Sequence, residues 1–296
     1  TVILSYIMPV TKRLTLLFLA SLLSCLAFSQ DKDLKNEKPE RPGWSFGLNL
    51  GITTPSSFPA NFYNGSSGND NNLDRILGNK YYKEQIVPKI GYNYLGWESP
   101  SAMSYKASMS VGFYVRYEFL KHRGFFAQFN YTKLKANDIF FLELDLPSGV
   151  SFDARYLQCP IRGEEERTMI ELGYFHEIPL REKILLSIET GLQLTNTKVL
   201  ANEIMIQDMT FNIKYDGEHP DGEWSTNTRY DIRQGGIGFG VFAGSHLRLL
   251  FSEKISFDPG FDLYMQNINL EGYQSFRLTP YFFARIIFHD FFSNEQ

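Results

Sequence analysis

Eight titratable side chains are spaced so that they could form a network of ion pairs inside a protein. They are Arg116, Glu118, Glu177, Glu189, His246, Arg248, Asp258 and Arg285. Each lies on the polar face of a segment in which apolar and polar residues alternate, as Arg248 does between Leu247 and Leu249. Opposite charges in a confined, low-dielectric space should pair, because an unpaired buried charge is costly. We expect a network that plugs the interior. The alternative is a gated narrow pore, whose pairs break to let solute pass.

Catalysis would need a nucleophile with a histidine and an acid in reach. Ser245 and His246 are adjacent in sequence, so on a strand they point to opposite faces. His176 falls on an apolar face, His219 lies in a loop among acids, and His289 follows the core of the last alternating segment. No triad can be assembled from these positions, so the sequence predicts a protein that is not an enzyme.

A short acidic stretch is the candidate site for a cation. Asp216, Glu218, Asp221 and Glu223 are interspersed with glycines that allow sharp turns. Four carboxylates could collect Ca²⁺, which takes about six to eight oxygen ligands. The spacing is not that of an EF-hand loop, and a solvated acidic hairpin tip is the simpler interpretation. We therefore expect no resident metal and no cofactor.

The elements that must position these residues are eight segments with a period of two residues. They cover residues 44–53, 107–119, 125–132, 170–178, 184–194, 236–249, 255–265 and 277–288. Their length suits tilted membrane strands, which need about 9–11 residues. A soluble sandwich also alternates, but it seldom needs strands this long. Glycines and mid-strand charges on the polar face suit a narrow lumen.

We therefore predict an all-β fold, a membrane-spanning antiparallel up-and-down β-barrel of eight strands with long extracellular loops. The count becomes ten if two further hairpins join the barrel. One would pair residues 139–146 with 150–161, and the other 204–215 with 225–232. Both could instead extend the barrel strands above the membrane.

The connections between the segments differ in length. Residues 120–123, 179–183 and 251–254 are short turns, as is the last connection near 270–273, whereas 54–106, 133–169 and 198–235 are long. Short turns on one side and long loops on the other are typical of outer-membrane barrels, with the short turns in the periplasm. An even strand count then leaves both termini in the periplasm.

The first long loop is a candidate contact surface. Residues 56–72 are rich in Gly, Asn and Ser, which predicts a mobile segment. Residues 81–97 then bring Tyr81, Tyr82, Tyr92, Tyr94 and Trp97. Exposed aromatic residues suit contact with a glycan or protein partner. Those of residues 92–97 suit an aromatic girdle at the membrane surface equally well.

The N-terminal residues have the pattern of a secretory signal peptide. Lys12 and Arg13 precede the apolar run Leu14–Leu26, and small residues in Ala27–Ser29 favour cleavage before Gln30. We assign residues 1–7 to an upstream extension, 8–29 to the signal peptide, 30–43 to a periplasmic linker and 44–292 to the barrel. A lipoprotein signal with Cys25 acylated is the alternative. The processed chain keeps only Cys159, so it would have no internal disulfide.

Composition excludes several classes of protein. The chain has 296 residues, a formal net charge of −4, 16% aromatic residues and 23 glycines. Its mean hydropathy of −0.24 excludes a bundle of membrane-spanning helices. The mildly acidic balance argues against nucleic acid as a partner.

Three stretches resemble the PorT-like small outer-membrane barrels. They are the hairpin formed by Val111–Phe119 and Phe125–Tyr131, the stretch Ile188–Leu192, and the stretch Tyr156–Ile161. The resemblance implies a small barrel, usually without a known ligand or activity. Cys159, the acidic run Glu164–Glu166 and the polar end 293–296 depart from the family pattern.

The sequence thus predicts a non-enzymatic protein of the bacterial outer membrane. Outer-membrane lipid surrounds it, ion pairs close its lumen, and its outer loops bind a protein or glycan partner. A narrow channel or a component of a secretion apparatus is the first alternative, and a lipid A-modifying barrel enzyme is the second.

Overall fold

The structure is a computed structural model that describes residues 43–147, 155–213 and 234–289. The predicted extension, signal peptide and all of the linker but residue 43 lie outside these ranges. So do the acidic stretch 216–223, His219 and the segment 225–232. Within the described ranges, β1 begins at Gly43 and β10 ends at His289.

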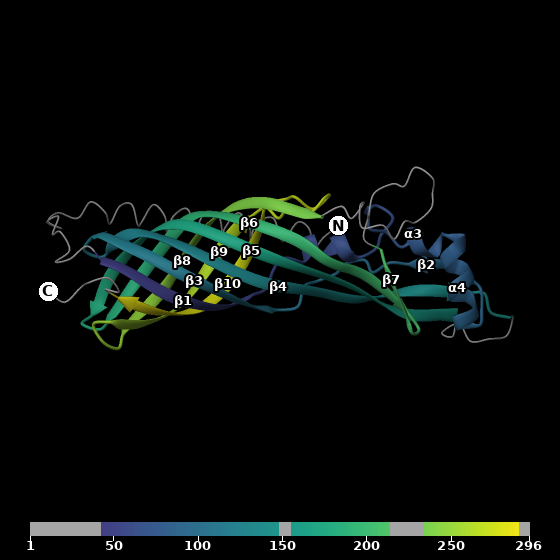
Figure 1. Cartoon of the computed structure of the whole chain (residues 1–296), viewed down its shortest axis with the longest axis horizontal. Coiled ribbons are helices and arrows are strands. Elements are labelled where there is room, and N and C mark those ends of the chain that lie inside the picture. The colour runs from purple at the N-terminus through teal and green to yellow at the C-terminus, as the bar shows by residue number, and fades with distance from the viewer. Residues whose placement is uncertain (1–42, 148–154, 214–233, 290–296) are drawn as a thin grey trace, which may run out of the picture.

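Eight antiparallel strands close into a ring (Figure 1). They are β1 (Gly43–Thr53), β3 (Ser108–Leu120), β4 (Arg123–Leu144), β5 (Tyr156–Arg181), β6 (Ile184–Ile206), β8 (Gly235–Leu250), β9 (Ile255–Gln266) and β10 (Arg277–His289). Neighbours in the ring follow chain order, and β1 pairs with β10 to close it. The predicted eight-stranded up-and-down barrel is confirmed.

Side chains alternate between the outside and the lumen along every barrel strand. In β1, Leu48 and Leu50 are exposed, whereas Asn49 between them is 1% exposed. The outer face carries an apolar band around the ring: Leu48, Leu50, Ile52, Val111, Phe113, Phe125, Phe129, Ile170, Leu172, Leu192, Leu194, Phe239, Val241, Met265, Phe282 and Ile286 are exposed. Apolar residues outside and polar residues inside are the arrangement that a barrel wall needs in lipid.

Three strands run far beyond the others. β4, β5 and β6 contain 22, 26 and 23 residues and form a wall above the ring. β4 and β5 stay paired as far as Glu143 and Tyr156. Residues 133–144 and 156–169 of this predicted connection are strand, so the described part of the hairpin predicted at 139–146 and 150–161 extends the barrel strands β4 and β5, which is the second of the two arrangements predicted for it. The period of two continues there, with Leu134, Phe140 and Leu142 buried on the inner face, so the backbone stays extended.

Two short strands cover the edges of this wall. β2 (Tyr94–Glu98) pairs with the end of β4, and β7 (Met209–Asn212) pairs with the end of β6. They protect edges that would otherwise expose unpaired backbone groups. Neither strand belongs to the ring, so a ten-stranded barrel is not formed. Because Tyr94 is buried beside the tip of β4, residues 94–98 lie well beyond the apolar band, and the girdle interpretation fails for them.

The first long connection folds into a cap, which we define as residues 54–107. It contains α2 (Ser57–Ala60), η1 (Asn61–Tyr63), α3 (Asp74–Leu77) and α4 (Lys80–Ile90). Asn79 caps the N-terminus of α4 with a side chain that accepts from the Tyr81 N–H, and Gly91, with a φ of 83°, caps its C-terminus. In the segment predicted to be mobile, residues 57–63 form α2 and η1, and Ala60, Phe62 and Tyr63 enter a core.

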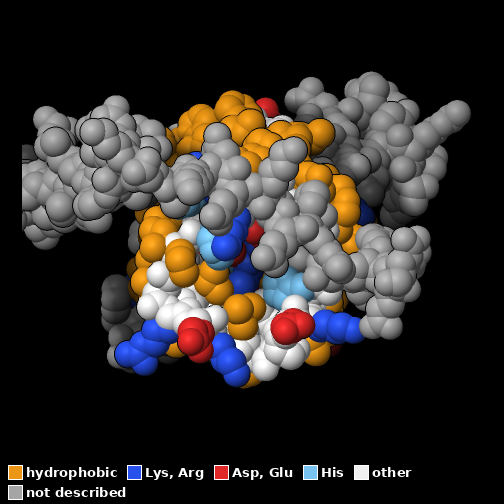
Figure 2. All heavy atoms as spheres, turned by 90° about the vertical axis from the view of Figure 1, so that its left-hand side faces the viewer, with side chains coloured by type: hydrophobic (Ala, Val, Ile, Leu, Met, Phe, Trp, Pro, Cys, Tyr) orange, Lys and Arg blue, Asp and Glu red, His pale blue; other side chains and the backbone are white. Residues whose placement is uncertain are grey.

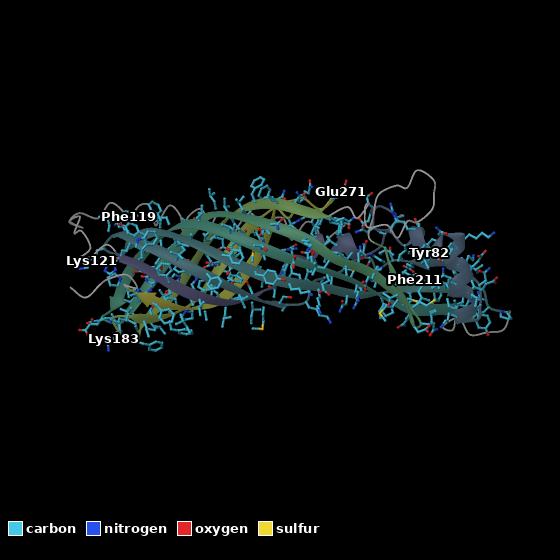
Figure 3. The ribbon with its side chains drawn as sticks, viewed as in Figure 1. Tyr82, Phe119, Lys121, Lys183, Phe211 and Glu271 are labelled. Atoms are coloured by element: carbon cyan, nitrogen blue, oxygen red, sulfur yellow. The ribbon has the colours of Figure 1, made fainter. Side chains whose placement is uncertain are left out.

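This upper core joins the cap to the inner face of the wall. Phe62, Tyr63, Leu73, Ile76 and Ile86 of the cap pack among residues of β4, β5 and β6. Ile268 and Leu270 of the β9–β10 connection, residues 267–276, join the same core. In Figure 3, Lys121 and Lys183 mark the turn end, Tyr82 and Phe211 mark the tip of the wall, and Glu271 lies between them.

Candidate functional site

The eight predicted network residues lie on the lumen side of the barrel. Seven are buried, and the Glu118 side chain is 25% exposed at the turn-end rim. Viewed from the turn end, hydrophobic side chains surround a centre where charged and histidine side chains gather (Figure 2). The structure brings these residues together in two linked groups.

The first group lies at the turn end and is organised by two arginines. Arg116 on β3 binds Glu177 on β5 at 2.5 Å and Glu118 at 3.0 Å. Arg248 on β8 binds the same Glu177 and, at 2.6 Å, Asp258 on β9. Glu177 therefore bridges two cations from non-adjacent strands. Buried carboxylates paired in this way are hard to separate, because each partner left alone would carry an unscreened charge.

The second group lies deeper in the lumen. Arg285 on β10 reaches Glu189 on β6 at 2.8 Å, and Tyr114 on β3 donates to the same carboxylate at 2.8 Å. His246 lies 3.8 Å from Glu189 and 3.3 Å from Asp258, so it links the two groups. Strand pairing alone does not bring β3, β6 and β10 together; their side chains meet only because the ring is narrow.

Aromatic rings fill the space around these ion pairs. Tyr114, Phe126, Phe175, Phe242, Tyr264, Tyr281, Phe283 and Ile287 form one buried cluster. The Arg116 guanidinium lies 4.3 Å from the Phe175 ring centre, and that of Arg285 lies 3.9 Å from the Phe283 ring centre. Stacking against ring faces stabilises both guanidinium groups away from water. These aromatic residues share the inward direction of the charged residues on their strands, but the predicted network did not include them.

Glu171 and Asp262 are further lumen carboxylates that the prediction omitted. Glu171 on β5 accepts hydrogen bonds from Gln128, Asn130 and Tyr264, at 3.1, 3.2 and 3.1 Å. Asp262 on β9 lies 3.7 Å from Arg285. Among the described residues, no basic side chain lies within 4.0 Å of Glu171, and its partners are neutral donors. The sequence contained a signal for both. Glu171 is an even number of residues from Glu177 on β5, and Asp262 is an even number from Asp258 on β9, so each pair points to the same side of its strand.

A second buried ion pair lies where the barrel meets the cap. Arg167 donates to Glu165 at 2.6 Å, and Tyr63 and Tyr105 of the cap donate to the same carboxylate at 2.5 and 3.0 Å. Gly163 leaves room for the Tyr63 ring, which would collide with any Cβ there. These contacts fix the cap over the mouth of the lumen. Glu165 belongs to the acidic run that the sequence analysis noted only as atypical.

His289 contacts two serines, which raises the question of a catalytic serine–histidine pair. It is the last residue of β10, directly after the predicted core of that strand. Its Nε2 lies 3.0 Å from Ser256 Oγ and its Nδ1 lies 3.1 Å from Ser45 Oγ. A triad requires a carboxylate at Nδ1, and here that position holds a serine. Ser256 is also fully buried, so a substrate could not reach it.

Other candidate chemistry is absent from the described ranges. No group of three or more His, Cys, Asp or Glu residues there is arranged to hold a metal ion. No helix of the described residues is both long and apolar enough to cross a membrane. Cys159 is a buried free thiol, and burial raises its pKa to about 12.

The ring of eight antiparallel strands, apolar outside and charged inside, defines a small transmembrane β-barrel. No family model matches the chain, and no curated protein matches it.

Solved structures of similar shape include Ail, the attachment invasion locus protein of Yersinia pestis, in complex with the heparin analogue sucrose octasulfate. It has 10% identity and a TM-score of 0.37 over 84% of this chain and 99% of that chain. Neisserial surface protein A has 9% identity and a TM-score of 0.38 over 83% and 96%. OprG from Pseudomonas aeruginosa has 8% identity and a TM-score of 0.38 over 87% and 97%. Because these identities and TM-scores are low, we assign the fold from the strand pairing and the burial of the side chains and not from these similarities.

Proposed function

We propose that this protein is a non-enzymatic barrel of the bacterial outer membrane, with a closed lumen and a cap that binds a protein or glycan partner. The observation that carries the proposal is the double closure of the interior. Ion pairs and aromatic rings fill the lumen, and the apolar upper core lies above them. In a barrel filled in this way, partners bind to the outer surfaces, and solutes do not pass through the lumen.

The outer-membrane location rests on the apolar band. Only a closed barrel or a helix satisfies its backbone groups in lipid, and this chain closes its barrel through β1 and β10. Membership of the PorT-like barrels is part of the proposal and rests on the hairpin at 111–131. Heat-modifiability of the detergent-extracted protein, coupled to fractionation of the two membranes, tests both the barrel and its location.

The cap is the proposed partner surface because it is ordered and carries exposed aromatic residues. Tyr81 and Tyr92 are 64% and 47% exposed, and Leu95 of β2 is 64% exposed. Large apolar side chains held on a packed scaffold bind with little loss of conformational entropy. A glycan array probed with detergent-solubilised protein and with its Y81A/Y92A variant tests this assignment. Equal signals from both proteins would remove Tyr81 and Tyr92 from the partner surface.

A narrow channel is the first alternative, alone or within a secretion apparatus. Planar bilayers separate it from the closed barrel. We expect no steady conductance from the wild type, because passage would require breaking the Glu177 and Glu189 ion pairs and displacing the upper core. A steady current that the variants R248Q or E189Q alter would support the channel. The second alternative, a lipid A-modifying enzyme, predicts a lipid A mass profile that changes when the protein is absent.

A further inference from the structure

Three lysines gather on the outer face of the wall. Lys106, Lys133 and Lys135 are all exposed. The Lys106 N–H donates to the Lys135 carbonyl at 2.9 Å, and Tyr105 bridges Ala136 beside them, so the two lysines lie opposite each other on antiparallel backbone. Lys133 and Lys135 are two residues apart and point to the same face. Like charges placed directly opposite each other destabilise a sheet unless an anion balances them.

The height of these lysines follows from the strand register. Phe129, Ile170 and Leu194 form the last apolar row of the band, and Tyr131, Thr168 and Asn196 form the next row outward. Lys133, Glu166 and Lys198 form the row after that. Each row adds about 7 Å along the strands, since two residues rise by about 3.4 Å each. Lys133 therefore lies about 14 Å along the strand beyond the last apolar row, and Lys106 and Lys135 lie about 20 Å beyond it, on the side away from the short turns.

The nearby acidic residues that the structure describes leave Lys106 and Lys135 without an ion pair, although Glu164 stands opposite Lys135 in the strand register. Glu164 binds Lys133, and Glu166 lies 3.5 Å from Lys198 and accepts from the Tyr131 hydroxyl at 3.1 Å. The side-chain oxygen of Asn137, in the orientation in which it accepts, lies 3.2 Å from Lys106 Nζ, so the partner of Lys106 is neutral. In the described part of the chain, no carboxylate lies within 4.0 Å of Lys106 or Lys135. Two positive charges thus remain unpaired on the cap side of the band.

We propose that Lys106, Lys133 and Lys135 bind a phosphate of an anionic lipid headgroup in the leaflet on the cap side. This inference rests on the proposed function, because it takes the apolar band to lie in a membrane. A lipid whose acyl chains cover Phe129 and Ile170 would direct its headgroup phosphate towards the lysines. The phosphate would then relieve the repulsion between Lys106 and Lys135.

The experiment uses the purified full barrel in phosphatidylcholine vesicles that contain bis-phosphorylated or dephosphorylated lipid A. Native mass spectrometry of the detergent-released protein measures how much lipid A stays bound. We expect one phosphorylated lipid A per barrel, and about thirtyfold weaker retention in K106Q/K135Q, since each lysine near an anionic surface contributes a factor of about five. The matched control is K121Q/K183Q, whose lysines lie at the turn end and should not affect retention.

Three results would overturn the inference: equal retention by wild type and K106Q/K135Q, equal retention of both lipid A forms, or full displacement by millimolar inorganic phosphate. Vesicle flotation separates this failure from failure of the proposed function. A protein that does not float with vesicles is not a membrane barrel. A protein that floats but retains lipid A independently of its lysines is a barrel without this site.

Discussion

Arg285 and Glu189 join two barrel strands, β10 and β6, that are not neighbours in the ring. Arg285 Nη1 on β10 lies 2.8 Å from Glu189 Oε2 on β6, and both side chains are fully buried. Tyr114 adds a hydrogen bond from β3 to the same carboxylate, so three strands meet at one group. The closed lumen of the proposed function depends on contacts of this kind.

Removing the arginine should destabilise the barrel strongly. In R285A the Glu189 carboxylate stays buried without its cation, which costs about 3–5 kcal/mol of unfolding free energy. Urea unfolding of the refolded protein in detergent measures this loss. The double variant R285L/E189L should lose less than R285A, because it buries no unpaired charge. A loss in R285A no larger than that of the exposed control K183A would show that the pair does not matter.

Glu171 and Glu189 should respond in opposite ways to the same substitution. E189Q removes the charge that Arg285 needs and should lower the unfolding free energy by about 2 kcal/mol or more. E171Q removes a buried charge whose hydrogen-bond partners are all neutral, and Gln128 has a free side-chain oxygen that can accept from the new amide. We expect E171Q to match or exceed the wild type in urea unfolding at neutral pH. Equal losses in both variants would contradict this assignment.

Gly163 should decide whether the cap stays docked. A Cβ at this position collides with the Tyr63 ring, so G163V should push η1 away from β5 and break the hydrogen bond to Glu165. Trypsin cleavage at Lys80, Lys83 and Lys89 in α4 should then be about tenfold faster, because cleavage follows the population of the open cap. The control G68A changes a cap glycine with open space around it. Unchanged cleavage in G163V would show that Tyr63 does not hold the cap.

The cap should open at high pH. Burial, reinforced by Glu165, raises the pKa of Tyr63 and Tyr105 well above the usual range, and burial raises the pKa of Tyr94 and of Cys159 to about 12. In an open cap these groups ionise at their ordinary pKa values of about 10 and 8.5. Stability of the docked cap is therefore constant below about pH 8.5 and falls as the pH rises beyond it.

The Cys159 thiol reports this opening. Alkylation by iodoacetamide, followed by mass spectrometry of the Cys159 peptide, should be very slow at pH 8 and should accelerate above about pH 10. The double variant Y63F/Y105F has fewer groups to ionise and should show a weaker acceleration. Alkylation at pH 8 as fast as in urea-unfolded protein would contradict the burial of the thiol.

The alternation of apolar and polar residues was sufficient to predict the ring. The direction of a strand side chain depends only on its position along the strand, so the parity of Arg116, Glu189 and Arg285 could be read from the sequence. The same rule places Glu171 and Asp262 on the lumen side, although the predicted network did not include them. The eight-strand count followed from the number of alternating segments.

Only the tertiary structure decided which charges pair and what covers the lumen. Glu177 pairs with both Arg116 and Arg248 because a narrow ring brings β3, β5 and β8 together. The spacing of these residues in the sequence does not reveal that their side chains are close. The cap could not be predicted, since its apolar residues are scattered among Gly, Asn and Ser and become a core only against the wall of β4, β5 and β6. Local pattern determines the direction of each side chain, whereas contacts between distant segments depend on how the chain closes in space.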